Sequence, residues 1–257
     1  MKWLRNSGCS INQRGNMTKS LIAAAILSAS FFAQAADGRG AFIIDAYGDS
    51  TTAGVMSSGG KNIITPGNEM ANLQKMLQSK YGSAIEVKNH GVPGAQAAEL
   101  LYNKGKDDPS GWSERMAHSD AKLILLNYAI NDARHFYFKD KNTHLESPEE
   151  YGRIMTTLVR EAKAHNKLVV LQEPNPICGK VERWNVWPYV YQLNEVAKAE
   201  GVPIVKQWTA IKARRDWQSG MSADCIHPSE SLYQQKAQQT FDVISANFGK
   251  ELSQSGS

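Results

Sequence analysis

Cysteine is rare in this chain of 257 residues, which has only three, and long apolar runs are missing. The apolar run from Leu21 to Ala33 is shorter than the ~20 residues that cross a bilayer as a helix, which argues against a membrane-spanning chain. No repeat or low-complexity segment interrupts the sequence, which excludes a disordered or collagen-like protein. The formal net charge is only +4, and several positive residues precede residue 40, so we infer no nucleic-acid partner. The balance of 42% hydrophobic and 21% charged residues predicts one globular domain.

The first 35 residues have the pattern of an export signal. Ala33-Gln34-Ala35, at the end of the apolar run, is the small-x-small pattern that a signal peptidase needs. We therefore predict a signal peptide over residues 1–35, a mature domain over 36–257, and a periplasmic or secreted protein without stable membrane insertion. An uncleaved membrane anchor is the alternative, and translation from Met17 would shorten the signal. Positive residues precede the apolar run, namely Lys2, Arg5, Arg14 and Lys19.

The positions of the three cysteines suggest a disulfide in the exported domain. Cys9 would be removed with the signal, which leaves Cys178 and Cys225 in the mature domain. In an oxidising compartment such a pair is a candidate disulfide. Two unrelated buried thiols are the alternative, because the sequence does not show whether the two residues come within bridging distance.

Short apolar runs alternate with amphipathic stretches along the mature chain. The runs predict strands over residues 41–47, 85–88, 123–128, 168–172 and 203–205, and helical spacing predicts helices over 68–80, 148–165, 190–200 and 232–248. This alternation favours an α/β fold with a parallel sheet and helices on both faces. In such sheets, binding and chemistry collect at the carboxyl edge, so the residues just after each strand are candidates for a site.

Ser50 follows the first predicted strand, in the sequence Gly48-Asp49-Ser50. A serine at a strand-to-helix junction exposes its hydroxyl beside the free N–H groups of the helix, which can stabilise an oxyanion. The alternative role is a helix cap. Gly94 follows the second strand and Asn131 the third, and a backbone N–H or an Asn amide can serve the same oxyanion, although both residues also suit turns.

Asp224 and His227 lie near the C-terminus, three residues apart in a predicted turn before a helix. An Asp so placed can hydrogen-bond the imidazole Nδ1 and leave Nε2 free to act as a base toward a serine. A helix cap and a structural histidine are the alternatives.

Together these residues resemble the SGNH (GDSL-like) hydrolases over nearly all of the mature chain. Gly48-Asp49-Ser50 matches the first block of that family, Gly94 the second, Asn131-Asp132 the third, and Asp224-x-x-His227 the fifth. The resemblance implies a three-layer α/β/α sandwich with a flavodoxin-like sheet of about five strands. It also implies a serine esterase with no cofactor and no metal. In it Ser50 is the nucleophile, His227 the base and Asp224 its orienter, and the oxyanion is held by the N–H groups of Ser50 and Gly94 and by the Asn131 amide.

The sequence departs from the family pattern at two positions. Thr51 replaces the usual Leu after Gly-Asp-Ser, and Ala129 replaces the Gly that opens the third block. Ala tolerates the same backbone as Gly only where φ is negative, so this substitution bears on the geometry of the loop more than on the role of Asn131. Gly91 also competes with Gly94 for the oxyanion role.

Arg134, Trp184 and Trp187 lie in segments that follow the third and fourth strands, and we predict that they bind substrate. Export and aromatic loops favour removal of a small acyl group, such as O-acetyl, from a carbohydrate. A lysophospholipase or thioesterase, an acyltransferase, and a silent carbohydrate-binding domain remain alternatives. A metal-dependent hydrolase built on Asp49, His90 and the Asp224–His227 pair is disfavoured because no His-Glu-x-x-His motif or dense ligand cluster occurs. The α/β-hydrolase family is disfavoured because Gly-x-Ser-x-Gly is absent.

Overall fold

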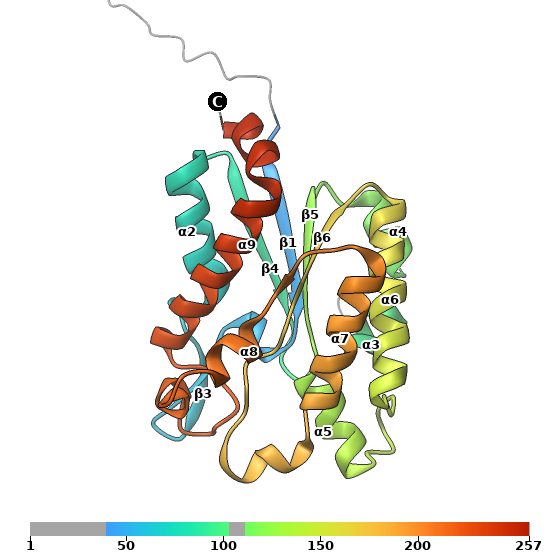
Figure 1. Ribbon diagram of the computed structural model, residues 1–257, viewed down its shortest axis with the longest axis vertical. Helices are drawn as coiled ribbons and strands as arrows, with labels where there is room; N and C mark the ends of the chain where they lie inside the picture. Colours follow the sequence, from blue (N-terminus) through green and yellow to red (C-terminus); the bar gives the residue numbers. More distant parts are fainter. Residues whose placement is uncertain (1–39, 103–110, 257) are drawn as a thin grey trace, which may run out of the picture. The chain divides into compact units, whose positions relative to one another are not determined.

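The computed structural model describes residues 40–102 and 111–256. The predicted signal peptide, which includes Cys9, lies outside these residues, so its presence and removal stay predictions. A parallel sheet with the strand order β4-β1-β5-β6-β7 forms the centre of the fold (Figure 1). The strands are β1 (Phe42–Gly48), β4 (Ile85–Gly91), β5 (Leu123–Asn127), β6 (Leu168–Gln172) and β7 (Ile204–Val205). All five predicted strands are thus present, although β4 extends three residues further than the sequence indicated.

Helices cover both faces of the sheet (Figure 1). One face carries α2 (Glu69–Tyr81) and α9 (Glu230–Gly256), a helix with a kink at Phe248. The other face carries α3 (Ala97–Leu101), α4 (Trp112–His118), α6 (Pro148–Ala164) and α7 (Trp187–Glu200). The remaining helical segments are α1 (Ser50–Ala53), α5 (Ile130–Phe138), η1 (Gly179–Trp184), α8 (Gln207–Lys212) and η2 (Trp217–Gly220). None of the helices in the part of the chain that the structure describes is long and apolar enough to cross a membrane.

Alternate residues of the strands divide the core into two layers. Leu123 and Leu125 of β5 pack with α2 and α9, whereas Ile124 and Leu126 pack with α3, α4, α6 and α7. Because successive strand side chains point to opposite faces, a sheet covered on both sides needs continuous apolar strands. This explains why the apolar run Leu-Ile-Leu-Leu, which begins at Leu123, indicated a buried strand. Helices on both faces of the sheet confirm the predicted three-layer α/β/α sandwich.

The strand order places a topological switch point beside β1. Numbered by their order in the chain, the five strands run 2-1-3-4-5, which is the flavodoxin-like arrangement. Within this sheet β4 lies on one side of β1 and β5 lies on the other, so the loops at their carboxyl ends diverge. Ser50, Gly94 and Asn131 follow β1, β4 and β5, and the topology brings them to this crevice.

A small antiparallel hairpin was not predicted. It consists of β2 (Val55–Ser58) and β3 (Lys61–Ile64), with Val55 opposite Ile64. Its turn is Gly59-Gly60, and both glycines have positive φ, which suits the two-residue turns that close hairpins. The strands are only four residues long and β3 is exposed along its whole length, so no buried run marked them.

Candidate active site

Ser50 is the first residue of α1, directly after β1. Asp49 precedes it as the helix cap and accepts the backbone N–H of Thr51 at 2.8 Å. Capping is therefore done by Asp49, which leaves the Ser50 hydroxyl available. Burial raises the pKa of Asp49 above its ordinary value, although the Thr51 hydrogen bonds oppose this. The turn is tight: a side chain at Gly48 would lie 2.1 Å from the Thr52 hydroxyl, so only glycine fits there.

A continuous hydrogen-bonded chain joins Ser50, His227 and Asp224. His227 Nε2 lies 2.8 Å from Ser50 Oγ, and His227 Nδ1 lies 2.5 Å from Asp224 Oδ2. The other carboxylate oxygen, Asp224 Oδ1, accepts the backbone N–H groups of Ile226 and His227, each at 3.0 Å. Burial pushes the pKa of Asp224 upward, but these N–H groups and the His227 ring outweigh it, so the pKa lies below its ordinary value. The arrangement holds an ionised carboxylate against Nδ1 and leaves Nε2 facing the serine.

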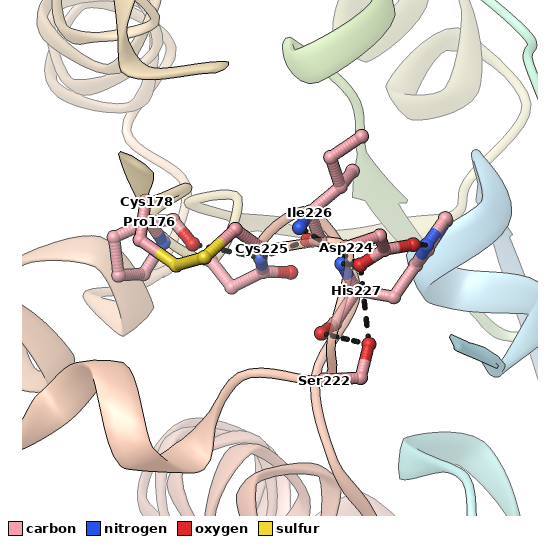
Figure 2. Close-up of a disulfide and its surroundings, with 8 residues drawn as sticks. Pro176, Cys178, Ser222, Asp224, Cys225, Ile226 and His227 are labelled. Atoms are coloured by element: carbon pink, nitrogen blue, oxygen red, sulfur yellow. Dashed lines mark hydrogen bonds and ion pairs between the residues drawn. A yellow bond between two sulfur atoms is a disulfide. The ribbon is translucent and has the colours of Figure 1, made fainter. Parts of the chain in front are cut away.

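The loop that carries Asp224 and His227 is tied to the segment after β6. Cys178 and Cys225 form a disulfide with Cα atoms 4.9 Å apart, beside Asp224 (Figure 2). The N–H of Cys178 also donates to the carbonyl of Cys225 at 2.9 Å, and the Asn175 amide donates to the Ile226 carbonyl at 2.9 Å. The sequence left open whether Cys178 and Cys225 form a disulfide or are two unrelated thiols, and in the structure they form the disulfide. Three separate links therefore join this loop to the segment after β6.

A cavity of about 520 Å³ opens at Ser50. Gly94 and Asn131 line it with Ser50 and His227, so the residues predicted to hold an oxyanion share one pocket. The Asn131 amide donates to the Ala95 carbonyl at 3.1 Å, which links the two loops. Gly91, the competing glycine, has another role: a side chain there would lie 2.2 Å from the backbone nitrogen of Ala53. Gly91 lets β4 approach α1, whereas Gly94 faces the cavity.

Ala129 has a backbone conformation that is unusual for alanine. Its φ is +134°, a value that favours glycine, and its side chain is fully buried. The backbone N–H of Ala129 donates to Asp132 Oδ2 at 3.0 Å, which fixes this conformation at the start of α5. The loop thus keeps a glycine-like backbone with an alanine in it, and the strain is borne by the surrounding contacts.

The predicted substrate-binding residues separate into two groups. Arg134 and Trp184 line the cavity, and the Arg134 guanidinium lies 5.9 Å from the Trp184 ring centroid. Trp187 is not among the residues that line the cavity. Trp187 is the first residue of α7, and its side chain is half exposed. Its ring centroid lies 6.4 Å from that of Trp208. The structure therefore gives no support to a substrate contact from Trp187.

His90, a candidate metal ligand from the sequence, is paired with residues outside the triad. Its Nε2 is 3.1 Å from Asp45 Oδ1, and its ring stacks on Tyr47 with centroids 4.7 Å apart. Asp49 is meanwhile engaged as the α1 cap. Among residues 40–102 and 111–256, no three or more His, Cys, Asp or Glu side chains are grouped as metal ligands would be.

The hairpin contributes residues that sequence reasoning missed. Asn62, Ile63 and Ile64 of β3 line the cavity, and the isoleucines are 45% and 63% exposed. The other strand of the hairpin, β2, contacts the loop that carries Asp224, because the Ser57 N–H donates to the Ser222 hydroxyl at 3.2 Å. The Gly-Gly turn was the one signal in the sequence that marked this element.

Comparison with known proteins places these residues in a family context. The sequence model of the GDSL-like lipase/acylhydrolase family matches residues 46–235, a span that includes Ser50 and His227. No curated protein matches the chain.

Several solved structures are similar in fold. A lipase/acylhydrolase from Enterococcus faecalis is 18% identical with a TM-score of 0.61, over 80% of this chain and 96% of that one. An acetylxylan esterase from Geobacillus stearothermophilus is 22% identical with a TM-score of 0.61, over 80% and 95%. TesA is 18% identical with a TM-score of 0.59, over 79% and 98%. At these identities the likeness concerns the fold.

Proposed function

This chain belongs to the GDSL-like lipase/acylhydrolase family, and within that family we propose that it is an exported serine carboxylester hydrolase that works through an acyl-enzyme. The observation that carries the proposal is the chain of contacts from Ser50 Oγ to His227 Nε2 at 2.8 Å and from His227 Nδ1 to Asp224 at 2.5 Å. A nucleophile, a base and an orienting carboxylate in this relation define the serine-hydrolase arrangement by geometry and role.

The first half-reaction follows from this geometry. Ser50 Oγ attacks the ester carbonyl carbon while His227 Nε2 takes the hydroxyl proton, and the carbonyl oxygen becomes an oxyanion. The N–H groups of Ser50 and Gly94 and the Asn131 amide stabilise that charge. When the C–O bond to the alcohol breaks, His227 gives its proton to the leaving oxygen. Asp224 keeps the imidazole in the required tautomer and stabilises the imidazolium.

The second half-reaction returns the enzyme to its starting state. His227 takes a proton from water as the water oxygen attacks the acyl carbonyl on Ser50. Collapse of the new tetrahedral intermediate breaks the bond to Ser50 Oγ, which recovers the proton from His227, and the carboxylic acid leaves. A carbohydrate hydroxyl in place of water would make the same steps an acyl transfer.

We assign the substrate as a carbohydrate that carries a small acyl group such as O-acetyl. Arg134, Asn62 and Trp184 offer polar and aromatic contacts for a sugar at the rim of the cavity. The similarity in fold to an acetylxylan esterase agrees with this class. Export rests on the signal pattern of residues 1–35, and a disulfide beside the triad is in keeping with an oxidising compartment.

A longer acyl chain is the second candidate, and the hairpin favours it. Ile63 and Ile64 are well exposed to solvent, yet they line the cavity with Val55, Ile130 and Ile226. An apolar chain laid on these side chains would remove their exposed surface from water, which stabilises binding by about 25 cal/mol per Å². A lysophospholipid or a thioester would supply such a chain.

Hydrolysis of p-nitrophenyl esters from acetyl to palmitoyl tests these proposals together. Ser50→Ala is expected to lower kcat by several orders of magnitude, whereas Ser113→Ala, an exposed serine on α4, is the matched control. Equal activity of wild type and Ser50→Ala would contradict the nucleophile. Highest kcat/KM on acetyl, with acetate released from acetylated xylan, supports the carbohydrate substrate. A maximum on octanoyl or longer esters that Ile64→Ser abolishes supports the second candidate.

A further inference from the structure

Two buried carboxyl groups, Asp132 and Glu146, lie against the loops that carry the proposed oxyanion donors, and neither takes part in the triad. Both side chains are fully buried. Asp132 follows Asn131 in the first turn of α5, and Glu146 precedes the cap of α6. The two carboxyl groups are neighbours, because they accept successive backbone N–H groups at the start of α3, Asp132 that of Ala97 and Glu146 that of Ala98.

Asp132 joins the starts of two helices. Its Oδ1 accepts the backbone N–H of Ala97 at 2.9 Å, and its Oδ2 accepts that of Ala129 at 3.0 Å. Ala97 begins α3, three residues after Gly94, and Ala129 caps α5, two residues before Asn131. One carboxylate therefore ties the Gly94 loop to the Asn131 loop.

Glu146 adds to this tie from the segment just before α6. Its Oε1 accepts the backbone N–H of Ala98 and the Gln96 amide, each at 3.2 Å. Its Oε2 is buried and receives no donor from the residues that the structure describes. The Tyr189 hydroxyl fixes the backbone of the same residue by donating to the Glu146 carbonyl at 2.6 Å.

These contacts determine where the proton lies. Two ionised carboxylates in contact and away from water would repel each other strongly, so buried carboxyl pairs share a proton. Asp132 already accepts two N–H groups and acts as the carboxylate, whereas Glu146 Oε2 has no donor and is free to carry a proton. Burial and the neighbouring Asp132 raise the pKa of Glu146 far above its ordinary value, in agreement with this assignment.

We propose that Glu146, as a neutral acid whose O–H donates a hydrogen bond to Asp132, is a positioning residue that sets the separation of the Gly94 N–H and the Asn131 amide. This inference rests on the proposed function, because it concerns the oxyanion site of the same reaction. Glu146 does not touch the substrate. It acts by holding Asp132, and through it the two loops, in one arrangement.

Comparison of Glu146→Gln with Glu146→Leu tests this role. Gln keeps the shape and supplies an amide donor to Asp132 and an acceptor for Ala98, so it is expected to retain most of the kcat. Leu removes both contacts and lets the loops shift, and displacements near 1 Å can cost on the order of 10²-fold in rate. We expect kcat on p-nitrophenyl acetate to fall by about 10- to 100-fold in Glu146→Leu, with KM little changed.

Two further readouts separate positioning from general damage. The acidic limb of the kcat/KM profile is expected to stay in place in both variants, because the triad itself is not altered. Infrared spectra of the wild type at neutral pH are expected to contain the carbonyl band of a protonated carboxylic acid that Glu146→Gln lacks. That spectrum needs neither a folded Leu variant nor any turnover.

Several outcomes would overturn the proposal. A folded Glu146→Leu with wild-type kcat, a Glu146→Gln as impaired as the Leu variant, or the absence of the acid band would each do so. Loss of the proposed function is recognised separately, because then the wild type would fail on every ester or Ser50→Ala would match it.

Discussion

Breaking the Cys178–Cys225 disulfide is expected to cost both stability and turnover. The perturbation is the double variant Cys178→Ala/Cys225→Ala, or the wild type under reductant. The bridge joins residues 47 positions apart and lies beside Asp224, so it closes a large loop and restrains the orienting carboxylate at the same time. Because Cys178 is buried, alanine avoids placing a polar group at that position.

The size of the stability effect follows from the loop. A cross-link over 47 residues removes unfolded-state entropy worth about 4 kcal/mol at 25 °C in the chain-entropy account. Two links to the segment after β6 remain after the bridge is lost: the Cys178 N–H to the Cys225 carbonyl, and the Asn175 amide to the Ile226 carbonyl. The loop therefore stays folded but less restrained, and we expect kcat to fall by about 10-fold.

Urea unfolding and ester kinetics measure the two effects on the same samples. The double variant and the reduced wild type are expected to lose similar amounts of unfolding free energy, in the range of about 2–4 kcal/mol. Reductant added to the double variant is the control and should change nothing. An unfolding free energy and a kcat equal to those of the oxidised wild type would refute the reasoning, because the bridge would then restrain neither the unfolded chain nor the loop.

Three further predictions concern single side chains. Ala129→Gly should raise the free energy of unfolding by about 1 kcal/mol in urea, because glycine adopts the positive φ without strain; a decrease would mean that packing of the buried methyl outweighs the strain. Asp224→Asn should lower kcat on the order of 10⁴-fold with unchanged circular dichroism, since the imidazole takes the wrong tautomer; a kcat near that of the wild type would remove Asp224 from the triad. Glu146 has a raised folded-state pKa, so its stability contribution is present below its unfolded value of 4.5 and is lost as pH rises toward the folded value. The unfolding free energy of wild type relative to Glu146→Gln should therefore fall between about pH 5 and 8, by up to about 1.4 kcal/mol per unit, and a flat difference would argue against the shared proton.

The sequence was most informative about the buried strands and about the residues at the carboxyl edge of the sheet. Continuous apolar runs marked the buried strands. Ser50, Asp224 and His227 were candidates because each follows a strand or precedes a helix at the carboxyl edge, and the resemblance to the SGNH family supplied their roles. The parallel topology then brings them together although Ser50 and His227 are 177 positions apart. The choice between Gly91 and Gly94 needed the structure, since it depends on which backbone each glycine approaches.

Features that depend on tertiary contacts were not predictable. The β2–β3 hairpin is stabilised by its contacts with the active-site loops, so its short exposed strands have no periodic signal. The positive φ of Ala129 runs against its intrinsic preference and is imposed by its hydrogen bond to Asp132. The Asp132–Glu146 pair was not predicted, because its shared proton depends on the burial of both carboxyl groups. The sequence shows two acidic residues but does not show that they are buried.

The central claim, that His227 activates Ser50 as the nucleophile, is tested most directly by covalent labelling. A fluorophosphonate reacts with an activated serine: the P–O bond forms, fluoride leaves, and the base takes the hydroxyl proton. Intact-mass and peptide analysis of the wild type should show one adduct, on Ser50, and both His227→Ala and Ser50→Ala should remain unlabelled. An adduct on another residue, or a His227→Ala variant labelled as fast as the wild type, would contradict the account.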